Sequence, residues 1–238
     1  MIHLVTFDLW NTIFTNKHYS DLRFDYFIQF LNKKQIPFSL KEVTNAFNST
    51  FNLLDVNLEE IDYRHIYTHN RISRLLLALN IKISKADCKE IELKFEEMIL
   101  KDPPPLKNGV KEALQELSDC YEIGLISNIG ISPGWIIKKV FKIYDIDKYF
   151  KLTLFSDETG FYKPKTIMFE TALKKLNCKP QNAIHIGDRL ETDIKGAKAC
   201  NMLTIWLNEL NSPNSQIIQP DYEVNQIYDV VKIIKEIK

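Results

Sequence analysis

Two acidic segments near opposite ends of the chain carry the residue types best suited to chemistry. In residues 5–12 and 185–193 a short apolar stretch runs into an aspartate, Asp8 or Asp188, where the chain must turn. Because the carboxyl ends of parallel strands meet at one edge of an open α/β sheet, where ligands bind, both carboxylates are predicted to face one site. Asp193 follows shortly after Asp188. Three neighbouring carboxylates repel one another, so we expect a divalent cation with oxygen ligands there.

Two further segments supply groups that suit a phosphate. An apolar stretch at residues 122–126 ends in Ser127 and Asn128, and Lys163 follows a turn at Gly160. A hydroxyl, an amide and an ammonium group are partners that phosphate oxygens need. Taken singly, Ser127 would be interpreted as a turn residue and Lys163 as a solvated surface charge. Their order along the chain is what favours a phosphate site.

These four segments, in this order, resemble the four motifs of the haloacid dehalogenase superfamily, a group of Rossmann-like hydrolases. Its members use an aspartate nucleophile and, in most branches, magnesium. The most specific match is the last motif, in which Gly187 and Asp188 are followed by Asp193 and then by residues 194–197, Ile-Lys-Gly-Ala. The resemblance covers the chain apart from an insertion after the first motif, where this family places its type 1 helical cap.

The resemblance implies a role for each acidic residue and for the lysine. Asp8 would be the nucleophile that attacks phosphorus and forms an aspartyl phosphate, a role that carboxylates can perform. Lys163 would neutralise the charge that Asp8 shares with the phosphate. The implied magnesium ligands are Asp8, the main-chain carbonyl of Trp10 and Asp188, with Asp193 as a partner in the outer shell. Two carboxylates, a carbonyl and a phosphate oxygen make a reasonable magnesium shell.

The resemblance also implies how the substrate is held and what it is. Thr12 would support the turn after the nucleophile, and Ser127 and Asn128 would hold the oxygens of the transferring phosphoryl group. The implied partner is a small phosphorylated metabolite. Lys plus Arg and Asp plus Glu number 31 each, so the chain has no basic excess for nucleic acid or an anionic membrane. We expect a monomer or a homodimer.

One position departs from the pattern of the family's phosphatases. They carry a second aspartate two residues after the nucleophile, which protonates the leaving oxygen and later activates water. Here that residue is Trp10. General acid–base catalysis commonly raises a reaction rate about 10²–10⁴-fold, so the replacement of this aspartate should lower phosphatase activity.

Three hypotheses about Trp10 stay open. The enzyme is a phosphohydrolase for esters or anhydrides with good leaving groups, or it takes a proton donor from the cap, where His18 and Asp21 are candidates. Alternatively it is a 2-haloacid dehalogenase, a branch that has an aromatic residue at this position. That branch does not keep the metal-binding Gly-Asp pair, whereas Asp188 is present here. Finally, it is a catalytically weak relative that binds a phosphorylated ligand, with Trp10 filling the pocket.

Composition fits an α/β enzyme inside the cell. With 238 residues, 45% of them hydrophobic, the chain can bury one α/β core and carry a smaller second unit. The cysteines are scattered without a Cys-x-x-Cys pair, which favours reduced thiols over a disulfide framework or a zinc site. The apolar start is too short for a signal peptide, and no stretch approaches the length of a membrane span. A cytoplasmic location is therefore expected.

Glycine usage and helical periodicity divide the chain into two units. All seven glycines lie at or after Gly109, whereas residues 16–105 show helical spacing, for example from Phe24 to Leu31. Three consecutive prolines at residues 103–105 end this region. We predict an all-helical cap over residues 16–105 with hinges near residues 15–17 and 101–106.

The rest of the chain, residues 1–15 and 106–238, is predicted to form a Rossmann-like core. Strands are expected at 2–7, 121–126, 152–155, 182–186 and 203–206, with a short edge strand at 222–224. Helices are expected at 108–118, 134–144, 166–177, 191–200 and 225–237. Alternating strands and helices predict an α/β fold whose parallel sheet is flanked by helices on both faces.

Three histidines lie outside the motif positions. His65 and His69 have the spacing of metal ligands, but no third ligand is evident, so we predict a solvated helix face. His185 lies within an apolar strand and is expected to be a packed core residue.

Overall fold

A parallel β-sheet forms the centre of the computed structural model, which describes residues 1–51, 58–213 and 217–237. Its order is β3-β2-β1-β4-β5-β6, and every neighbouring pair is parallel. The strands are β1 (Leu4–Phe7), β2 (Glu122–Ser127), β3 (Leu152–Phe155), β4 (Ala183–Gly187), β5 (Leu203–Leu207) and β6 (Tyr222–Val224). All six predicted strands are present, and the largest shift is at β1, which begins at Leu4 instead of residue 2.

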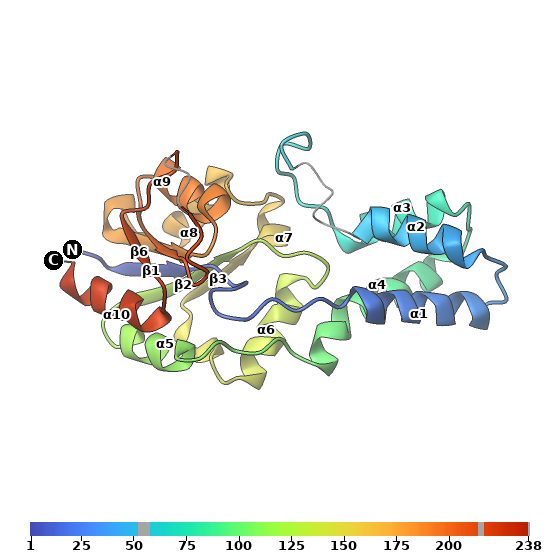
Figure 1. Cartoon of the computed structure of the whole chain (residues 1–238), viewed down its shortest axis with the longest axis horizontal. Helices are drawn as coiled ribbons and strands as arrows, with labels where there is room; N and C mark the ends of the chain where they lie inside the picture. The colour runs from blue at the N-terminus through green and yellow to red at the C-terminus, as the bar shows by residue number, and fades with distance from the viewer. Residues whose placement is uncertain (52–57, 214–216, 238) are drawn as a thin grey trace.

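Helices cover both faces of this sheet (Figure 1). One face packs on α5 (Val110–Ser118), α6 (Gly134–Ile143) and α10 (Ile227–Glu236), and the other on α8 (Thr166–Lys175) and α9 (Lys195–Ala199). Successive strand residues serve opposite faces, so Val5 joins the first apolar cluster and Leu4 the second. The predicted flanked parallel sheet is therefore confirmed.

The predicted helix over 191–200 differs from the observed structure. Residues Leu190–Ile194 form a wide π turn, and the α-helix begins only at Lys195. The turn is wide because Ile194 N donates to the carbonyl of Arg189, five residues earlier, at 3.3 Å; the Asp193 carboxylate accepts from Arg189 N at 3.0 Å. Such π turns concentrate at functional sites.

Four further helices lie together on the side toward which β1 points (Figure 1). They are α1 (Ser20–Lys33), α2 (Leu40–Phe51), α3 (Thr68–Ala78) and α4 (Lys85–Lys101). They share an apolar cluster separate from those of the sheet, which includes Phe27, Val43, Ile72 and Ile91. Helix α4 has a side-chain cap at its start, where the Ser84 hydroxyl accepts from Asp87 N at 3.0 Å.

The two segments that join these helices to the sheet run side by side. Thr15 N donates to the carbonyl of Pro105 at 2.9 Å, and Phe14 pairs with Leu106 in an antiparallel bridge. The crossings thus coincide with the predicted hinges. The extent of a cap over residues 16–105 stays a prediction.

A second contact between the helices and the core involves the segment before α3. His65 N donates to the carbonyl of Gly160 at 2.8 Å, and Tyr162 N donates to the carbonyl of Tyr63 at 2.7 Å. Ile66 N donates in turn to the Tyr162 hydroxyl at 3.1 Å. The helical group is therefore hydrogen-bonded to the core segment that leads directly into Lys163.

The predicted solvated helix face at His65 and His69 is wrong for His65. Helix α3 begins at Thr68, so His65 lies before it and is only 8% exposed. The contact with the core buries it, and a spacing of four residues gives no sign of a contact so distant in the chain.

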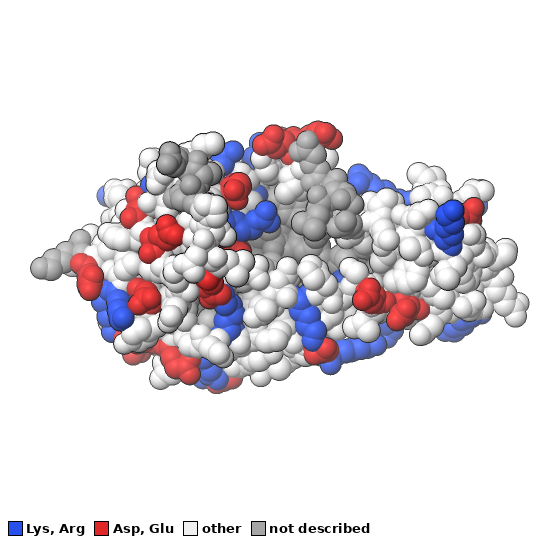
Figure 2. Space-filling view, viewed as in Figure 1, with Lys and Arg blue, Asp and Glu red and all other residues white. Residues whose placement is uncertain are grey.

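Neither the described helices nor the surface charge has the features of a membrane-spanning protein or of a strongly basic one. None of the described helices is both long and apolar enough to cross a membrane. Positive and negative side chains are interspersed over the face seen in Figure 2, in line with the balanced composition. A cytoplasmic location stays a prediction.

Candidate active site

Three aspartates converge at the carboxyl edge of the sheet. Asp8 follows β1 and Asp188 follows β4, and these strands are neighbours. Carboxylate oxygens of Asp8, Asp188 and Asp193 lie within 4.8 Å of one another, and the rest of the described chain holds no comparable group of His, Cys, Asp and Glu. Asp8 is 6% exposed and Asp193 only 1%. The two distant segments singled out in the sequence therefore meet in one buried acidic cluster.

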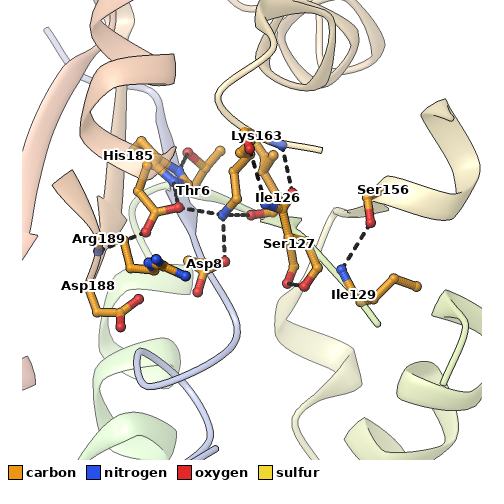
Figure 3. A network of polar contacts seen from close by, with 12 residues as sticks. Thr6, Asp8, Ile126, Ser127, Ile129, Ser156, Lys163, His185, Asp188 and Arg189 are labelled. Atoms are coloured by element: carbon orange, nitrogen blue, oxygen red, sulfur yellow. Dashed lines mark hydrogen bonds and ion pairs between the residues drawn. The ribbon is translucent and has the colours of Figure 1, made fainter. Parts of the chain in front are cut away.

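Lys163 reaches into this cluster and bridges two of its members (Figure 3). Its Nζ lies 2.5 Å from Asp8 Oδ1 and 2.7 Å from Asp193 Oδ1, and it donates to the carbonyl of Ile126 at 2.7 Å. The side chain is 1% exposed. A buried ammonium with hydrogen bonds to a carboxylate and a carbonyl, and an ion pair with a second carboxylate, is closely fixed in position.

The charges in the cluster do not balance. Burial, opposed by the charge of Lys163, raises the pKa of Asp8 to about 7. Burial and the charge of Asp193 raise the pKa of Asp188 to about 6. Burial alone would also raise the pKa of Asp193, but Lys163 and His185 together outweigh it and bring that pKa below its usual range. Lys163 therefore compensates Asp193 best and leaves Asp8 and Asp188 short of positive charge.

This imbalance fits a divalent cation. Asp188 is only partly buried, and its side-chain partner is Asn11, whose Nδ2 donates to Asp188 Oδ2 at 3.3 Å. The donors of the cluster are hard carboxylate oxygens, the kind that Mg²⁺ takes in small numbers while keeping several waters. The residues present, above all Asp8 and Asp188, thus suit a magnesium ion.

Asp193 also packs against His185 and Gly187, two residues of β4. Its Oδ1 lies 3.9 Å from Nε2 of His185, a fully buried ring whose Nδ1 contacts the Thr6 hydroxyl at 2.9 Å. The prediction that His185 is a packed core residue is confirmed. Gly187 leaves the space that Asp193 fills, because a Cβ at position 187 would lie 2.4 Å from Asp193 Cγ.

The residues predicted to hold the substrate lie in the loops around Asp8 and Lys163. Ser127 is fully buried at the end of β2, and its hydroxyl donates to the carbonyl of Asn128 at 3.0 Å. The Asn128 amide is bonded at both ends to the main chain of Lys163, accepting from its N at 2.7 Å and donating to its O at 3.2 Å. This amide therefore fixes the lysine segment. Thr12 is fully buried and its hydroxyl has no hydrogen-bond partner among the described residues.

Trp10 and Asn11 complete the turn after the nucleophile. Trp10 is partly exposed and packs against the apolar cluster of the sheet. Asn11, which the sequence analysis missed, has a φ of 56° and also receives hydrogen bonds from Asn16 N, at 3.2 Å, and from Lys107 Nζ. Asparagine adopts this left-handed conformation more readily than most residues. Its position between Trp10 and Thr12 could have been recognised as the tightest point of the turn.

The flanked parallel sheet and the acidic cluster with its buried lysine define a Rossmann-like hydrolase. The chain matches the haloacid dehalogenase-like hydrolase family over residues 2–201. It belongs to this family and is an enzyme, as the motifs predicted.

Comparison with individual proteins gives more distant likenesses. The glyceraldehyde 3-phosphate phosphatase of Pyrococcus furiosus is 36% identical over 99 residues, which cover 41% of this chain and 40% of that protein, so the match spans less than half of either. The structure of 2-haloacid dehalogenase from Pseudomonas syringae pv. Tomato superposes with a TM-score of 0.76 at 21% identity, covering 99% of both chains. YfnB from Bacillus subtilis, bound to magnesium, gives 0.63 at 19% identity, covering 98% of both. The two structures support the fold.

Proposed function

We propose that the enzyme is a magnesium-dependent phosphohydrolase that acts on a small phosphorylated metabolite through an aspartyl-phosphate intermediate. The carrying observation is the unbalanced cluster, in which Lys163 serves Asp8 and Asp193 while Asp188 has no cationic partner among the described residues. A site that needs a further positive charge suits a cation, and the bound cation would in turn attract an anionic phosphoryl substrate. The phosphatase relative supports the same class of reaction.

The chemistry follows from the placement of Asp8. One carboxylate oxygen of Asp8 attacks phosphorus, an O–P bond forms, and the bond to the leaving oxygen breaks with its electron pair. Water then attacks the aspartyl phosphate, which releases inorganic phosphate and restores the carboxylate. Lys163, 2.5 Å from Asp8, favours the ionised nucleophile and fixes its direction. Magnesium bound by Asp8, Asp188 and the Trp10 carbonyl would supply further positive charge for the phosphoryl oxygens.

The remaining roles complete the proposal. The Ser127 hydroxyl and the Asn128 segment hold phosphoryl oxygens, with the Asn128 side chain bound to Lys163 as described. Thr12 supports the turn after the nucleophile. Residues 16–105, which contain helices α1–α4, act as a cap that excludes water from the active site and selects the substrate.

The presence of Trp10 in place of an acidic residue limits which leaving groups the proposed enzyme can expel. An indole cannot protonate a leaving oxygen at neutral pH, because its N–H group donates a hydrogen bond but is far too weak an acid to give up its proton. His18 and Asp21 are both exposed at the start of α1, and no hydrogen bond or ion pair links them to the aspartates of the described site. We therefore favour substrates whose leaving group departs without a proton, such as acyl phosphates, phosphoanhydrides and aryl phosphates.

The first test measures hydrolysis of p-nitrophenyl phosphate with and without Mg²⁺. We expect turnover that requires Mg²⁺ and is abolished in Asp8→Asn, whereas Asp119→Asn, an exposed aspartate at the end of α5, keeps full activity. Acetyl phosphate should be a better substrate than an alkyl phosphate. Turnover that persists in Asp8→Asn would exclude Asp8 as the nucleophile.

Trp10 also favours a second candidate, a 2-haloacid dehalogenase that uses the same Asp8. Expelling a halide needs no acid, so an aromatic residue is acceptable at this position. Incubation with 2-chloropropionate in EDTA separates the two, because halide release without metal would replace the phosphohydrolase proposal. If neither substrate reacts, Trp10→Asp becomes decisive. A gain of phosphatase activity would reveal a complete site that lacks only its acid, and no gain would favour a ligand-binding relative.

A further inference from the structure

A second group of titratable side chains surrounds a cavity between α4 and the core, apart from the aspartate cluster. The cavity measures about 50 Å³. Glu92 and Glu96 line it from α4, His65 from the segment before α3, His69 from the first turn of α3, and Asp157 from α7 (Ser156–Thr159). None of these residues has a role in the proposed phosphohydrolase.

Two carboxylates in this cavity form no ion pair with the described residues. Glu96 is 7% exposed, and its carboxylate makes no hydrogen bond or ion pair with the described residues. Asp157 accepts from Gly134 N at 3.1 Å through Oδ2, but its Oδ1 is inaccessible to solvent and has no hydrogen-bond partner there. Glu92, by contrast, has an ion pair with Lys89 at 2.8 Å. Buried carboxylates are normally paired, so Glu96 and Asp157 require a cation or a proton.

The neighbouring groups supply only part of that positive charge. Burial, with a smaller contribution from the charge of Arg71, lowers the pKa of His65 to about 4, so this imidazole is neutral near pH 7. Burial, followed by the charge of Glu92, raises the pKa of Glu96 to about 7, and burial also raises the pKa of Asp157. The charge of Lys89 lowers the pKa of Glu96 and that of Lys138 lowers the pKa of Asp157, but burial outweighs both.

We propose that the cavity binds a divalent cation of the Mg²⁺ type, held by the carboxylates of Glu96 and Asp157 and by water. Two unpaired carboxylates match the charge of such an ion, and their oxygens match its preference for hard ligands. No three of the cavity's described carboxylate and imidazole ligand atoms lie within 4.8 Å of one another. The cavity therefore has no ready set of three side-chain ligands for a metal ion. Such a cavity suits an ion that keeps several bound waters, such as Mg²⁺, better than it suits zinc.

The bound ion would tie the helices to the loop that follows β2. The Ser132 hydroxyl donates to the carbonyl of Glu96 at 2.8 Å, and the Thr68 hydroxyl donates to the carbonyl of Ile131 at 2.7 Å. The same loop begins at Ile129, whose N donates to the Ser156 hydroxyl at 3.0 Å (Figure 3). Neutralising Glu96 and Asp157 should therefore strengthen the interface between α4 and the core without touching the aspartate cluster.

The test counts bound Mn²⁺, a spectroscopic substitute for Mg²⁺, by electron paramagnetic resonance at pH 8. We expect two equivalents in the natural chain and one in Asp188→Asn, which weakens the aspartate cluster. Glu96→Gln should also bind one, whereas Glu97→Gln, which removes the same charge one residue along α4, should still bind two. Mn²⁺ should raise the melting temperature of Asp188→Asn but not that of the double variant with Glu96→Gln.

Two results would overturn the proposal. One is the loss of all bound Mn²⁺ in Asp188→Asn, and the other is an unchanged count in Glu96→Gln. If Glu96→Gln does not fold, Asp157→Asn is measured in its place with the same expectation. A natural chain that binds one equivalent, lost in Glu96→Gln but kept in Asp188→Asn, would support this cavity site and contradict the magnesium site of the proposed function.

Discussion

The buried carboxylate of Glu96 gives the stability of the protein a specific dependence on pH. Its pKa is raised from 4.5 to about 7, chiefly by burial. In the unfolded chain it returns to the ordinary value. Below pH 4.5 both states hold the proton, whereas above pH 7 the folded state has lost it at a cost. Stability associated with the protonated form is therefore present below pH 4.5 and is lost as the pH rises through 7.

The size of the effect follows from the shift. About 2.5 pH units at 1.36 kcal/mol each gives about 3 kcal/mol, as an upper figure for a group with a small exposed fraction. Glu96→Gln keeps the shape and removes the titration. The free energy of unfolding of the natural chain, minus that of the variant, should fall by up to about 3 kcal/mol between pH 4.5 and pH 7 and then level off.

Urea unfolding at closely spaced pH values, in EDTA to remove divalent cations, measures this difference directly. Glu97→Gln serves as the control for losing a negative charge from α4. A difference between the natural chain and Glu96→Gln that stays constant to within about 0.5 kcal/mol would refute the argument that an uncompensated carboxylate is buried here. Adding Mg²⁺ at pH 8 should stabilise the natural chain more than Glu96→Gln, which keeps only the aspartate cluster as a cation site.

Three further predictions concern the aspartate cluster. Lys163→Met should abolish turnover and cost about 3–5 kcal/mol in urea unfolding, because buried carboxylates lose their ammonium; a stable, active variant would contradict this. Asn128→Ala removes two hydrogen bonds to the main chain of Lys163, so kcat for p-nitrophenyl phosphate should fall more than tenfold with little change in KM. An effect on KM alone would argue against this role. Gly187→Ala forces a Cβ against Asp193, so a lower melting temperature and weaker Mg²⁺ activation are expected, and natural values for both would be inconsistent with the close contact.

Much of the fold was predictable because it depends on local patterns. The four central strands of the sheet, β2, β1, β4 and β5, are short apolar stretches whose residues are mostly buried, so hydrophobicity alone marked their places. The meeting of Asp8 and Asp188 was predictable for a related reason, since each follows a strand of one parallel sheet. The prediction needed only the sheet edge and no side-chain detail.

Contacts between distant loops were not predictable. The burial of His65 depends on its pairing with Gly160, and the use of the Asn128 amide depends on the path of the Lys163 main chain. The cavity around Glu96 arises only when α4 meets the core. Such features are decided by the orientation of side chains in packed loops, for which a single sequence carries no periodic signal.

The paired crossings at Thr15 and Pro105 have a consequence for the history of the molecule. The two segments of the junction are hydrogen-bonded to each other, so the chain leaves the core and returns to it at the same place. The order of the strands in the sheet therefore does not depend on the helices inserted between these segments. A chain built this way can exchange, lengthen or lose its appended helices while the order of its strands stays untouched. The range of substrates can then change with the helices, while the catalytic residues at the edge of the sheet stay the same.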